Sequence, residues 1–577
     1  MSRRKLTYWL IAASGLAILV ITITLAFFDE AFMPEHEPVR TKSQMVVTAH
    51  PLASQAANTI LEQGGSAVDA AIAAQLVLTL VEPHASGIGG GLFMLVAGPG
   101  GDIRAYDGRE VAPKAVSPKM FFGLDGKPET SDRLATGGLA VGVPGAIAAM
   151  AMAHERYGKL PWWVLFKPAI QTAESGFPVS RLLSESVREL KAGNLERDML
   201  GTYFRPDGSP LHIGEIIRDP AYARTLRIIA EGGGGAFYKG KIADEIVARV
   251  RSARNPGRMT VSDLADYRAI ERKPICAPYR EFKVCTTPTP SGGMTLLQIL
   301  GMLRDQPSAQ LKPGTVSQVH LFSQASKLAY ADRAKWLGDP AFVRVPEEGL
   351  LDAGYLADRA SKIDSRRDLK GAGAGVPPSK SAALPRYTPQ RSPAWPGTSH
   401  LSIMDADGQA VSMTMSVQAS FGAQLRVAGF VLNNELTDFS AEPQIDGQPV
   451  ANAAAAGKRP LSAMSPAILF DGKGKIVGAI GSPGGRDIIA YNAQAIIDLL
   501  DTGSIAGAVS RPHFANFNGP TYLEKRSSLI RMIPRLIAMG HSVRLQKFES
   551  GLNGIWKTAN GLEGASDVRG EGLAVGK

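Results

Sequence analysis

The sequence predicts an α/β (α+β) protein in which strands and helices alternate along most of the chain. From Met45 onward, short apolar or alternating stretches are interspersed with longer stretches of helical period, several of them rich in alanine. The 577 residues are 45% hydrophobic and 20% charged, which suffices for a large buried core. The 62 glycines and 38 prolines indicate many turns and close backbone approaches rather than disorder. The length suits two to four domains or one large intertwined body.

The first half of the body contains both kinds of pattern. "SQMVVTAH" (43–50) predicts a strand, and "QGGS" (63–66) separates two Ala-rich helical segments within 51–83. Strands are predicted at 91–98 and 102–110, joined by the turn "GPGGD". Helical patterns then dominate 145–200, 216–252 and 315–335.

The second half begins after a tract without periodicity. Residues 366–397 are rich in Gly, Pro, Ser and Arg, which predicts a loop or a disordered segment. Strand-like sequence patterns resume at Thr398. Strands are predicted at 401–405, 410–417, 429–434, 466–470 and 475–482, followed by a helix at 488–503.

The N-terminus predicts export from the cytoplasm. Arg3, Arg4 and Lys5 precede 21 apolar residues, Tyr8 to Phe28, which are long enough to span a bilayer with the basic end inside. No A-x-A-like site follows, so an uncleaved anchor is favoured over a signal peptide within residues 1–29. Residues 30–45 form a polar linker. We expect the body on the periplasmic or extracytoplasmic face, anchored to the inner membrane or otherwise secreted to the periplasm.

Composition also excludes some functions. The net charge of +10 comes from scattered residues, and the sequence lacks the basic face with interleaved aromatic residues that nucleic-acid binding requires.

A hairpin with Arg280 and Glu281 at its tip places Cys276 opposite Cys285; a disulfide and two ordinary thiols both remain open. Without nearby histidine pairs, two cysteines do not form a zinc site.

Common catalytic motifs are missing from the sequence. There is no H-E-x-x-H, no Walker A pattern and no G-x-S-x-G elbow. "SGIGGGLF" (86–93) follows a helical segment rather than a strand, so it predicts close backbone approach and not a dinucleotide site.

The stretch that begins at Thr398 predicts a hairpin with one polar face. Thr398, His400 and Ser402 alternate with apolar residues, as do Ser412 to Gln418 on the next strand. Because directly opposite residues share a face, the loop "DADGQ" must contain an odd number of residues, and either Ser416 or Gln418 lies opposite Thr398. Such a hairpin alone is more often structural than catalytic.

Polar and glycine-rich segments downstream strengthen a functional interpretation. "LNNELTDFS" (432–440) places Glu435 and Asp438 three residues apart just after a strand. "KRPLSAMSP" (458–466) follows an Ala-rich loop. "GSPGGRD" (481–487) lies between a strand and a helix, where free backbone N–H groups can bind an anion or oxyanion.

These segments resemble the gamma-glutamyltransferase family of N-terminal-nucleophile hydrolases. The resemblance also covers "EPHASGIGGGLFML" (82–95), "YDGREVAP" (106–113), "GVPG" (142–145), "PSGGM" (290–294) and "GASDVRG" (564–570), in one order across about residues 45–575. It implies a four-layer αββα sandwich that needs no metal or organic cofactor. It also implies self-cleavage between Gly397 and Thr398, giving segments 46–397 and 398–577 that remain associated as a heterodimer.

The resemblance assigns roles to individual residues. Thr398 Oγ would attack a γ-glutamyl amide such as glutathione, its α-amine would act as base, and water or an amino acid or peptide would accept the acyl group. Ser416 would contact that amine, and the N–H groups of Gly484 and Gly485 would form the oxyanion hole. Residues expected to bind the substrate head group are Arg109 and Ser462 for the α-carboxylate, Glu435 and Asp438 for the α-ammonium, and Gln418 beside them.

Two positions depart from the family pattern. Ser462-Ala463 stands where two serines are common, and Gln418 stands where asparagine is usual. The loop at 441–457 is also shorter than the lid-bearing loop of many relatives. These departures motivate a second hypothesis, an acylase that cleaves glutaryl or other acyl amides such as cephalosporin side chains. A third, an unprocessed binding protein, conflicts with the intact Gly397-Thr398 junction and the two oxyanion glycines.

Overall fold

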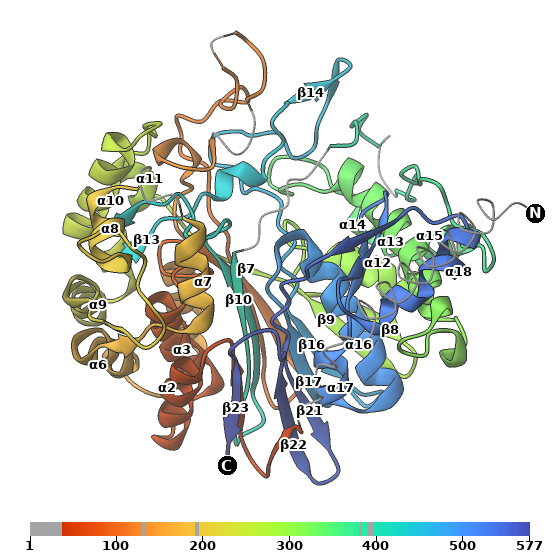
Figure 1. The fold of residues 1–577 in the computed structure, drawn as a ribbon, viewed down its shortest axis with the longest axis horizontal. Helices are drawn as coiled ribbons and strands as arrows, with labels where there is room; N and C mark the ends of the chain where they lie inside the picture. Colours follow the sequence, from red (N-terminus) through yellow and green to blue (C-terminus); the bar gives the residue numbers. More distant parts are fainter. Residues whose placement is uncertain (1–36, 124, 130–133, 191–194, 380–383, 391–396) are drawn as a thin grey trace, which may run out of the picture.

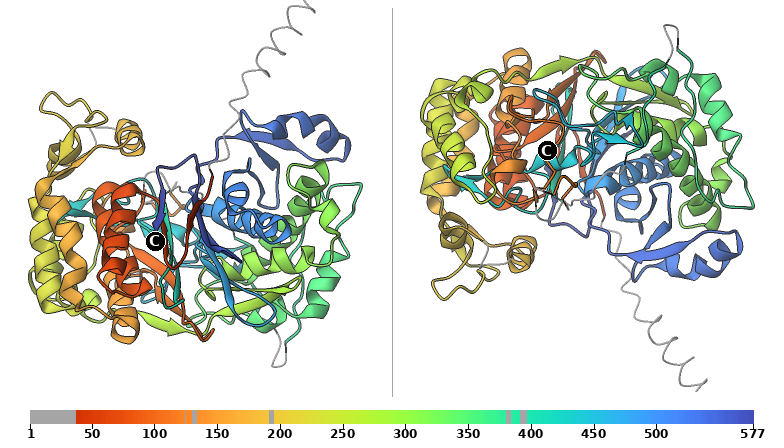
Figure 2. Two further views of the ribbon diagram at one scale, coloured as in Figure 1. Left: turned by 90° about the horizontal axis from the view of Figure 1, so that it is seen from below. Right: turned by 90° about the horizontal axis from the view of Figure 1, so that it is seen from above.

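Two seven-stranded antiparallel sheets lie face to face, and helices cover the outer side of each (Figures 1 and 2). The computed structural model describes residues 37–123, 125–129, 134–190, 195–379, 384–390 and 397–577. The four layers confirm the predicted αββα sandwich. The predicted membrane segment, residues 8–28, lies outside the described residues; within them, no helix combines the length and apolarity needed to cross a bilayer.

The first sheet carries the predicted hairpin at its centre. Its strands, in spatial order, are β23 (Leu573–Gly576), β2 (Met45–Thr48), β10 (Thr398–Met404), β11 (Ala410–Ser416), β3 (Gly91–Ala97), β4 (Ile103–Gly108) and β7 (Ile270–Arg272). Strands from both sides of the Gly397-Thr398 junction therefore pair within one sheet.

The second sheet is likewise built from both sides of the junction. Its strands, in spatial order, are β1 (Val39–Thr41), β22 (Gly561–Ser566), β21 (Asn553–Thr558), β17 (Ile476–Gly481), β16 (Ala467–Phe470), β9 (Phe282–Thr286) and β8 (Ile275–Tyr279). Because the predicted linker of residues 30–45 contributes β1, the folded body begins earlier than the sequence indicated.

Each sheet has its own helical layer. On the first sheet lie α2 (Pro51–Glu62), α3 (Ala67–Val81) and α5 (Ala146–Tyr157), with α6 (Lys167–Ser175), α7 (Arg181–Glu189), α8 (Arg197–Tyr203), α9 (Pro220–Gly232), α10 (Gly240–Ser252) and α11 (Val261–Ala265) beside them. On the second lie α12 (Gly293–Leu303), α16 (Ile488–Thr502) and α17 (Ile505–Ser510), with α13 (Val316–Trp336), α14 (Glu347–Leu350), α15 (Ala353–Ala360) and α18 (Ile533–Ala538) beside them.

Short strands form small satellite sheets. They are β5 (Phe177–Pro178) with β6 (Ile216–Ile217), β12 (Arg426–Val427) with β13 (Phe430–Val431), β14 (Gln444–Ile445) with β15 (Gln448–Pro449), and β18 (Phe514–Asn516) with β19 (Thr521–Glu524) and β20 (Val543–Gln546).

The central hairpin is buried on both faces, which explains why its polar residues do not meet bulk water. Leu401 and Ile403 join the core beneath the first helical layer, as the alternation predicted. The opposite face, with His400 and Ser402, packs against the second sheet: Asn553 of β21 donates to the His400 carbonyl at 2.9 Å and its own carbonyl accepts from Ser402 Oγ at 3.1 Å. Polar residues on this face therefore hold the two sheets together.

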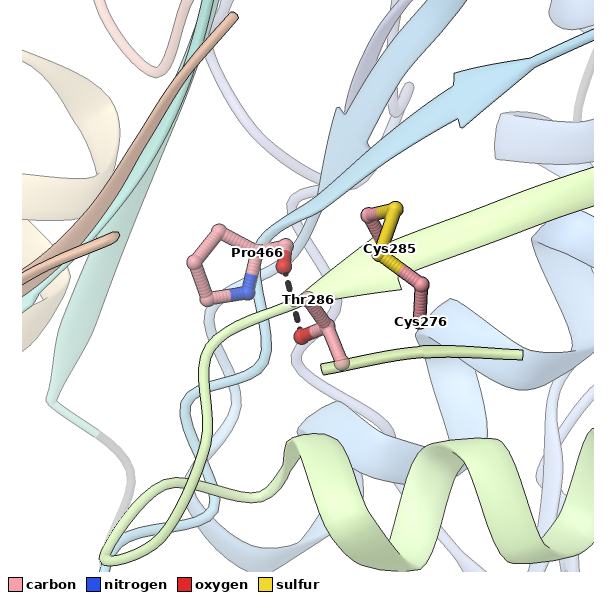
Figure 3. Close-up of a disulfide and its surroundings, with 4 residues drawn as sticks. All are labelled: Cys276, Cys285, Thr286 and Pro466. Carbon is pink, nitrogen blue, oxygen red and sulfur yellow. Dashed lines mark hydrogen bonds between the residues drawn. A yellow bond between two sulfur atoms is a disulfide. The ribbon is translucent and has the colours of Figure 1, made fainter. Parts of the chain in front are cut away.

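The hairpin predicted around the two cysteines is also present. β8 and β9 pair so that Cys276 faces Cys285, with Arg280 and Glu281 between the strands, and the two sulfurs form a disulfide (Figure 3). Of the two possibilities that the sequence left open, a disulfide or two thiols, the structure shows the disulfide. Beside it, Thr286 Oγ1 donates to the Pro466 carbonyl at 2.8 Å and ties β9 to the end of the 458–466 segment.

Candidate functional site

Thr398 begins β10, and the sheet register places Ser416 directly opposite it. Five residues, 405–409, separate Met404 from its partner Ala410, so the loop is odd-numbered as predicted. Of the two registers that the sequence left open, the structure selects the one with Ser416. Asp405 at the start of this loop accepts from the Ala67 N–H at the first turn of α3, where a carboxylate is favoured, and this contact fixes the far end of the hairpin.

Ser416 contacts both sides of the predicted scissile bond. Its Oγ donates to the Gly397 carbonyl at 2.7 Å, accepts from the Gln418 N–H at 2.8 Å, and lies 3.5 Å from Thr398 Oγ1. A hydroxyl that donates to a carbonyl oxygen polarises that carbonyl toward nucleophilic attack. Ser416 is therefore placed to assist attack at Gly397 in the intact chain.

Gly397 occupies a position where no side chain fits. A Cβ there would lie 2.3 Å from the Gln418 carbonyl oxygen and 2.8 Å from the Ala419 carbonyl carbon, and both are backbone atoms. We expect Gly397→Ala to displace the scissile carbonyl from Ser416 and to slow self-cleavage by about tenfold or more, because such overpacking costs roughly 1–3 kcal/mol. The time course of fragment appearance on denaturing gels measures this effect.

Gly371 supplies the matched control for that substitution. It lies in the same predicted loop tract, and a Cβ built there meets nothing within 4 Å. Gly371→Ala is expected to cleave at the wild-type rate. Equal cleavage rates for the two variants would show that the close contacts at Gly397 do not matter for processing.

Thr398 opens onto a cavity of about 340 Å³ between the two halves of the fold. Its hydroxyl-bearing side chain is almost covered, with 8% of the residue exposed. The cavity brings together most of the predicted site residues, namely Thr398, Ser416, Gln418, Glu435, Asp438, Ser462 and Gly485. Gly484 and Arg109 are not among the residues that line it, although both adjoin residues that do.

The two carboxylates lie on a short turn of 3-10 helix, Glu435–Asp438, that follows β13. Asn433 fixes this turn: its Nδ2 donates to the Gly89 and Gly142 carbonyls, and its Oδ1 accepts from the Glu435 N–H at 3.1 Å. The resemblance had not singled out this asparagine. Its position between two glycine-rich loops explains how the sequence segments 86–93 and 142–145 help to hold the site.

Arg109 lies beneath the cavity and is fully buried. Its Nη1 pairs with Glu435 and its Nη2 with Asp438, while its Nε donates to the Pro460 carbonyl at 3.1 Å. Gln418 Nε2 donates to the other oxygen of Asp438. The predicted cation and the two predicted anions therefore lie together, but in this structure they pair with one another.

Burial governs the ionisation of this cluster. It raises the pKa of Glu435 to about 7, against the lowering effect of Arg109, and raises the pKa of Asp438 as well. Glu110, whose carboxylate lies 3.6 Å from Arg109, has a pKa raised well above its usual range by burial and by Glu435. One guanidinium thus faces three buried carboxyl groups, of which at least one is inclined to hold a proton.

The glycine pair follows β17 and precedes α16, as the sequence predicted. Gly484 and Gly485 have φ values of 122° and 56°, which side chains rarely adopt. Within the described residues, neither backbone N–H donates to another protein group. Two adjacent unused N–H groups next to the cavity suit the predicted oxyanion hole.

Ser462 and Ala463 line the same cavity. Ser462 Oγ accepts from the Met464 N–H at 3.1 Å, which leaves the hydroxyl hydrogen for another acceptor. Ala463 offers only a methyl group. The hydroxyl that Ala463 lacks, compared with the serine common in the family, would therefore have lain inside the cavity.

Several cavity residues were not predicted from the sequence. Tyr330 and Arg333 come from α13, and Gln390 comes from the tract before the junction. Arg486 and Phe517 also line the cavity, and the Arg486 guanidinium lies 4.1 Å from the centre of the Phe517 ring. The helical period predicted α13 but gave no signal that one turn of it lines the cavity with Thr398, because that arrangement arises only from packing. His400, on the polar face with Thr398, pairs with Thr414 and Ser402 between the sheets and does not line the cavity.

Comparison with known proteins agrees with this geometry. Residues 53–577 match the family model described as Gamma-glutamyltranspeptidase. The glutathione hydrolase proenzyme of Escherichia coli (strain K12) is 35% identical over 545 residues, covering 92% of this chain and 91% of that protein.

Acylases are equally similar. The Acylase ACY 1 proenzyme of Pseudomonas sp. (strain SE83) is 35% identical over 565 residues, covering 94% of this chain and 95% of that protein. Among solved structures, a cephalosporin acylase from Bacillus halodurans matches with a TM-score of 0.82 and 28% identity, over 94% of this chain and 98% of that one. Family and fold follow from these matches, whereas the choice between the two substrate classes does not.

Proposed function

This chain belongs to the gamma-glutamyltranspeptidase family of enzymes, and we propose that it is a self-processing hydrolase and transferase that cleaves γ-glutamyl amides such as glutathione at Thr398. One observation carries the proposal. Thr398 shares its cavity with Glu435 and Asp438, whose carboxylates suit the α-ammonium of a γ-glutamyl group. The relatives described as proenzymes support processing into two associated segments.

Processing begins in the intact chain. Thr398 Oγ attacks the Gly397 carbonyl carbon, the C–N bond breaks, and the acyl group passes to the threonine oxygen, while the hydroxyl proton passes to the nitrogen that is released as the α-amine. Water then hydrolyses the ester and leaves Gly397 as a carboxylate. Ser416, which donates to the Gly397 carbonyl oxygen, stabilises the negative charge that develops there.

Turnover reuses the same hydroxyl. The freed α-amine takes the proton of Thr398 Oγ as the oxygen attacks the γ-carbonyl of the substrate, and the amine product departs with a proton. Gly484 and Gly485 N–H groups stabilise the oxyanion, each being worth about 3–4 kcal/mol in comparable sites. Water or an amino acid or peptide then resolves the γ-glutamyl ester.

The acidic end of the cavity recognises the ammonium group. Glu435 Oε1 pairs with Arg109, but Glu435 Oε2 is buried and has no hydrogen-bond partner within the described residues. An unsatisfied buried carboxylate oxygen favours a ligand that donates hydrogen bonds and carries positive charge. An α-ammonium supplies both.

We expect discrimination for γ-glutamyl substrates to decline as the pH falls below about 7. Protonation of Glu435 removes the negative charge that binds the α-ammonium, and burial raises the pKa of Glu435 to about 7. The ratio of kcat/KM for γ-glutamyl and glutaryl 4-nitroanilides measures this effect, because protonation of the Thr398 amine lowers both values equally and cancels. A ratio independent of pH between 5.5 and 8.5 would contradict the assignment of Glu435.

A related acylase activity is the second candidate. Ala463 removes one hydroxyl from the cavity and Gln418 adds a methylene, and the acylase relatives are as similar as the glutathione hydrolases. If the γ-glutamyl proposal holds, kcat/KM for γ-glutamyl 4-nitroanilide should exceed that for the glutaryl compound by about tenfold or more, given roughly 1.5–3 kcal/mol for a hydrogen bond to a charged group. Equal or better glutaryl cleavage would favour the acylase.

We further propose that the body works outside the cytoplasm, anchored by residues 8–28. The disulfide between Cys276 and Cys285 supports this location, because disulfides persist mainly in oxidising compartments. Separation of cell envelopes into soluble and membrane fractions, followed by detection of both segments, tests the proposal.

A further inference from the structure

Arg486 is a guanidinium at the cavity wall that forms no ion pair with the carboxylates of the described residues. It directly follows Gly485 and lines the same cavity as Thr398. Its Nε is buried, and its side chain donates no hydrogen bond to any residue that the structure describes. The adjacent carboxyl group, that of Asp487, accepts instead from Gln546 Nε2 at 2.9 Å. A partly covered cation without an acceptor in the protein favours an anionic ligand.

Aromatic rings support the Arg486 guanidinium. Its central carbon lies 4.1 Å from the centre of the Phe517 ring and 5.7 Å from that of Tyr522. On the other side, the Tyr330 hydroxyl donates to the Arg486 carbonyl at 2.8 Å, and the Tyr330 ring meets Phe517 edge to face at 5.2 Å. A guanidinium that stacks on an aromatic face keeps its N–H donors, which point outward in its own plane, available for a carboxylate. Arg486 is therefore preorganised to bind an anion.

The helix α13 shows that Arg486 and the residues expected to bind the head group lie at different ends of the cavity. Tyr330 and Arg333 both line the cavity and are three residues apart, which separates them by about 4.5 Å along the helix axis. Tyr330 contacts Arg486. Arg333, by contrast, donates to the Ser462 carbonyl at 2.8 Å. Arg486 therefore marks an aromatic end of the cavity, and Ser462 marks the end where the resemblance places the substrate head group.

The amine part of a substrate is the part that reaches the aromatic end. In the proposed reaction, the Gly484 and Gly485 N–H groups bind the oxygen of the carbonyl under attack, and Arg486 is the next residue. The acyl group extends from this carbonyl toward Ser462, so the amine beyond the scissile bond extends toward Arg486. When that amine is a dipeptide, its terminal carboxylate lies up to about 7 Å from the scissile nitrogen. A planar guanidinium can bind such a carboxylate through two parallel hydrogen bonds.

We propose that Arg486 binds the free carboxylate of the amine part, the C-terminal carboxylate of a peptide that leaves from the donor or accepts the acyl group, while Phe517 and Tyr522 support the guanidinium. This inference rests on the proposed function in the roles of Thr398, Gly484 and Gly485, but not on the identity of the acyl group. The cavity then selects both halves of its substrate by charge, the acyl half at one end and the amine half at the other.

Two donors that differ by one charge test the proposal in the processed enzyme: γ-glutamyl-glycylglycine and its C-terminal amide. In the wild type, kcat/KM for the carboxylate should exceed that for the amide by about tenfold, the lower range for a hydrogen bond to a charged group. Arg486→Gln should bring this ratio close to one, because any general effect on the oxyanion loop lowers both values equally and cancels. Arg486→Lys, which keeps the charge but not the planar fork, should give an intermediate ratio. Chromatography of the released dipeptide measures both reactions.

Arg156→Gln is the matched control. The Arg156 guanidinium also lies over an aromatic ring, 5.7 Å from the centre of Tyr157, but does not line the cavity. This variant should keep the wild-type ratio. A ratio near one in the wild type would overturn the proposal without any variant, so a misfolded Arg486→Gln protein does not prevent the test. A wild-type ratio in Arg486→Gln, or an equal fall in Arg156→Gln, would overturn it as well.

The same pair of amines on a glutaryl group separates this inference from the proposed function. If the enzyme cleaves glutaryl-glycylglycine but not the γ-glutamyl compound, the γ-glutamyl function fails, and the glutaryl pair then tests Arg486 by the same ratio. If the enzyme cleaves γ-glutamyl-glycylglycine and its amide with equal kcat/KM, the γ-glutamyl function stands and the role of Arg486 fails.

Discussion

Thr398→Ala is expected to leave the protein as one uncleaved chain and to lower amide turnover by about 10⁴-fold or more, as removal of a nucleophile does in other hydrolases. The alanine lacks the oxygen that attacks Gly397 and the oxygen that would carry the acyl group. Because Thr398 is a small residue at the start of β10, the fold should persist. Denaturing gels, intact mass and anilide turnover measure the outcome.

Thr398→Ser is the matched variant, since it keeps both a hydroxyl and an amine that cleavage can release. It should cleave and turn over substrate, though more slowly. A Thr398→Ala protein that still divides between Gly397 and residue 398, or that keeps substantial amidase activity, would show that another group is the nucleophile.

Arg109→Met is expected to lower the free energy of unfolding by about 3–5 kcal/mol, the usual cost of breaking a buried ion pair by removing one partner. The change leaves Glu435, Asp438 and Glu110 buried without their shared cation. Urea denaturation in the uncleaved Thr398→Ala background measures the loss without complications from separate chains.

The loss should be smaller at low pH. Without Arg109, the pKa values of the buried carboxyl groups lie further above their values in the unfolded chain, so each group takes up a proton on folding. As the pH falls, these groups become neutral and their charge no longer disfavours the folded state. The difference between Arg109→Met and its parent should therefore shrink from pH 8 to pH 5. Arg156, an exposed arginine 3.6 Å from Glu271, is the control: Arg156→Met should show no measurable loss.

The sequence carries more information on the proposed chemistry than on the substrate, for a physical reason. The proposed self-cleavage depends on neighbouring residues: Gly397, Thr398 and a strand that fixes the new terminus are encoded within one short stretch. Head-group recognition depends on residues from distant segments, for which the resemblance supplied roles but no geometry. Arg109 and the two carboxylates do lie together, but their mutual pairing could not be read from their separate motifs.

Side-chain period and turn residues act within a few positions, so the sequence alone predicted the alternation of strands and helices, the odd-numbered loop of the central hairpin and the position of Thr398 at its start. Three features became known only from the packing of the chain: Ser416 rather than Gln418 faces Thr398, the polar face of the hairpin holds two sheets together, and Arg333 and Gln390 reach the cavity. Those contacts join segments far apart in the chain, so they depend on how sheets and helices pack and leave no local signal in the sequence.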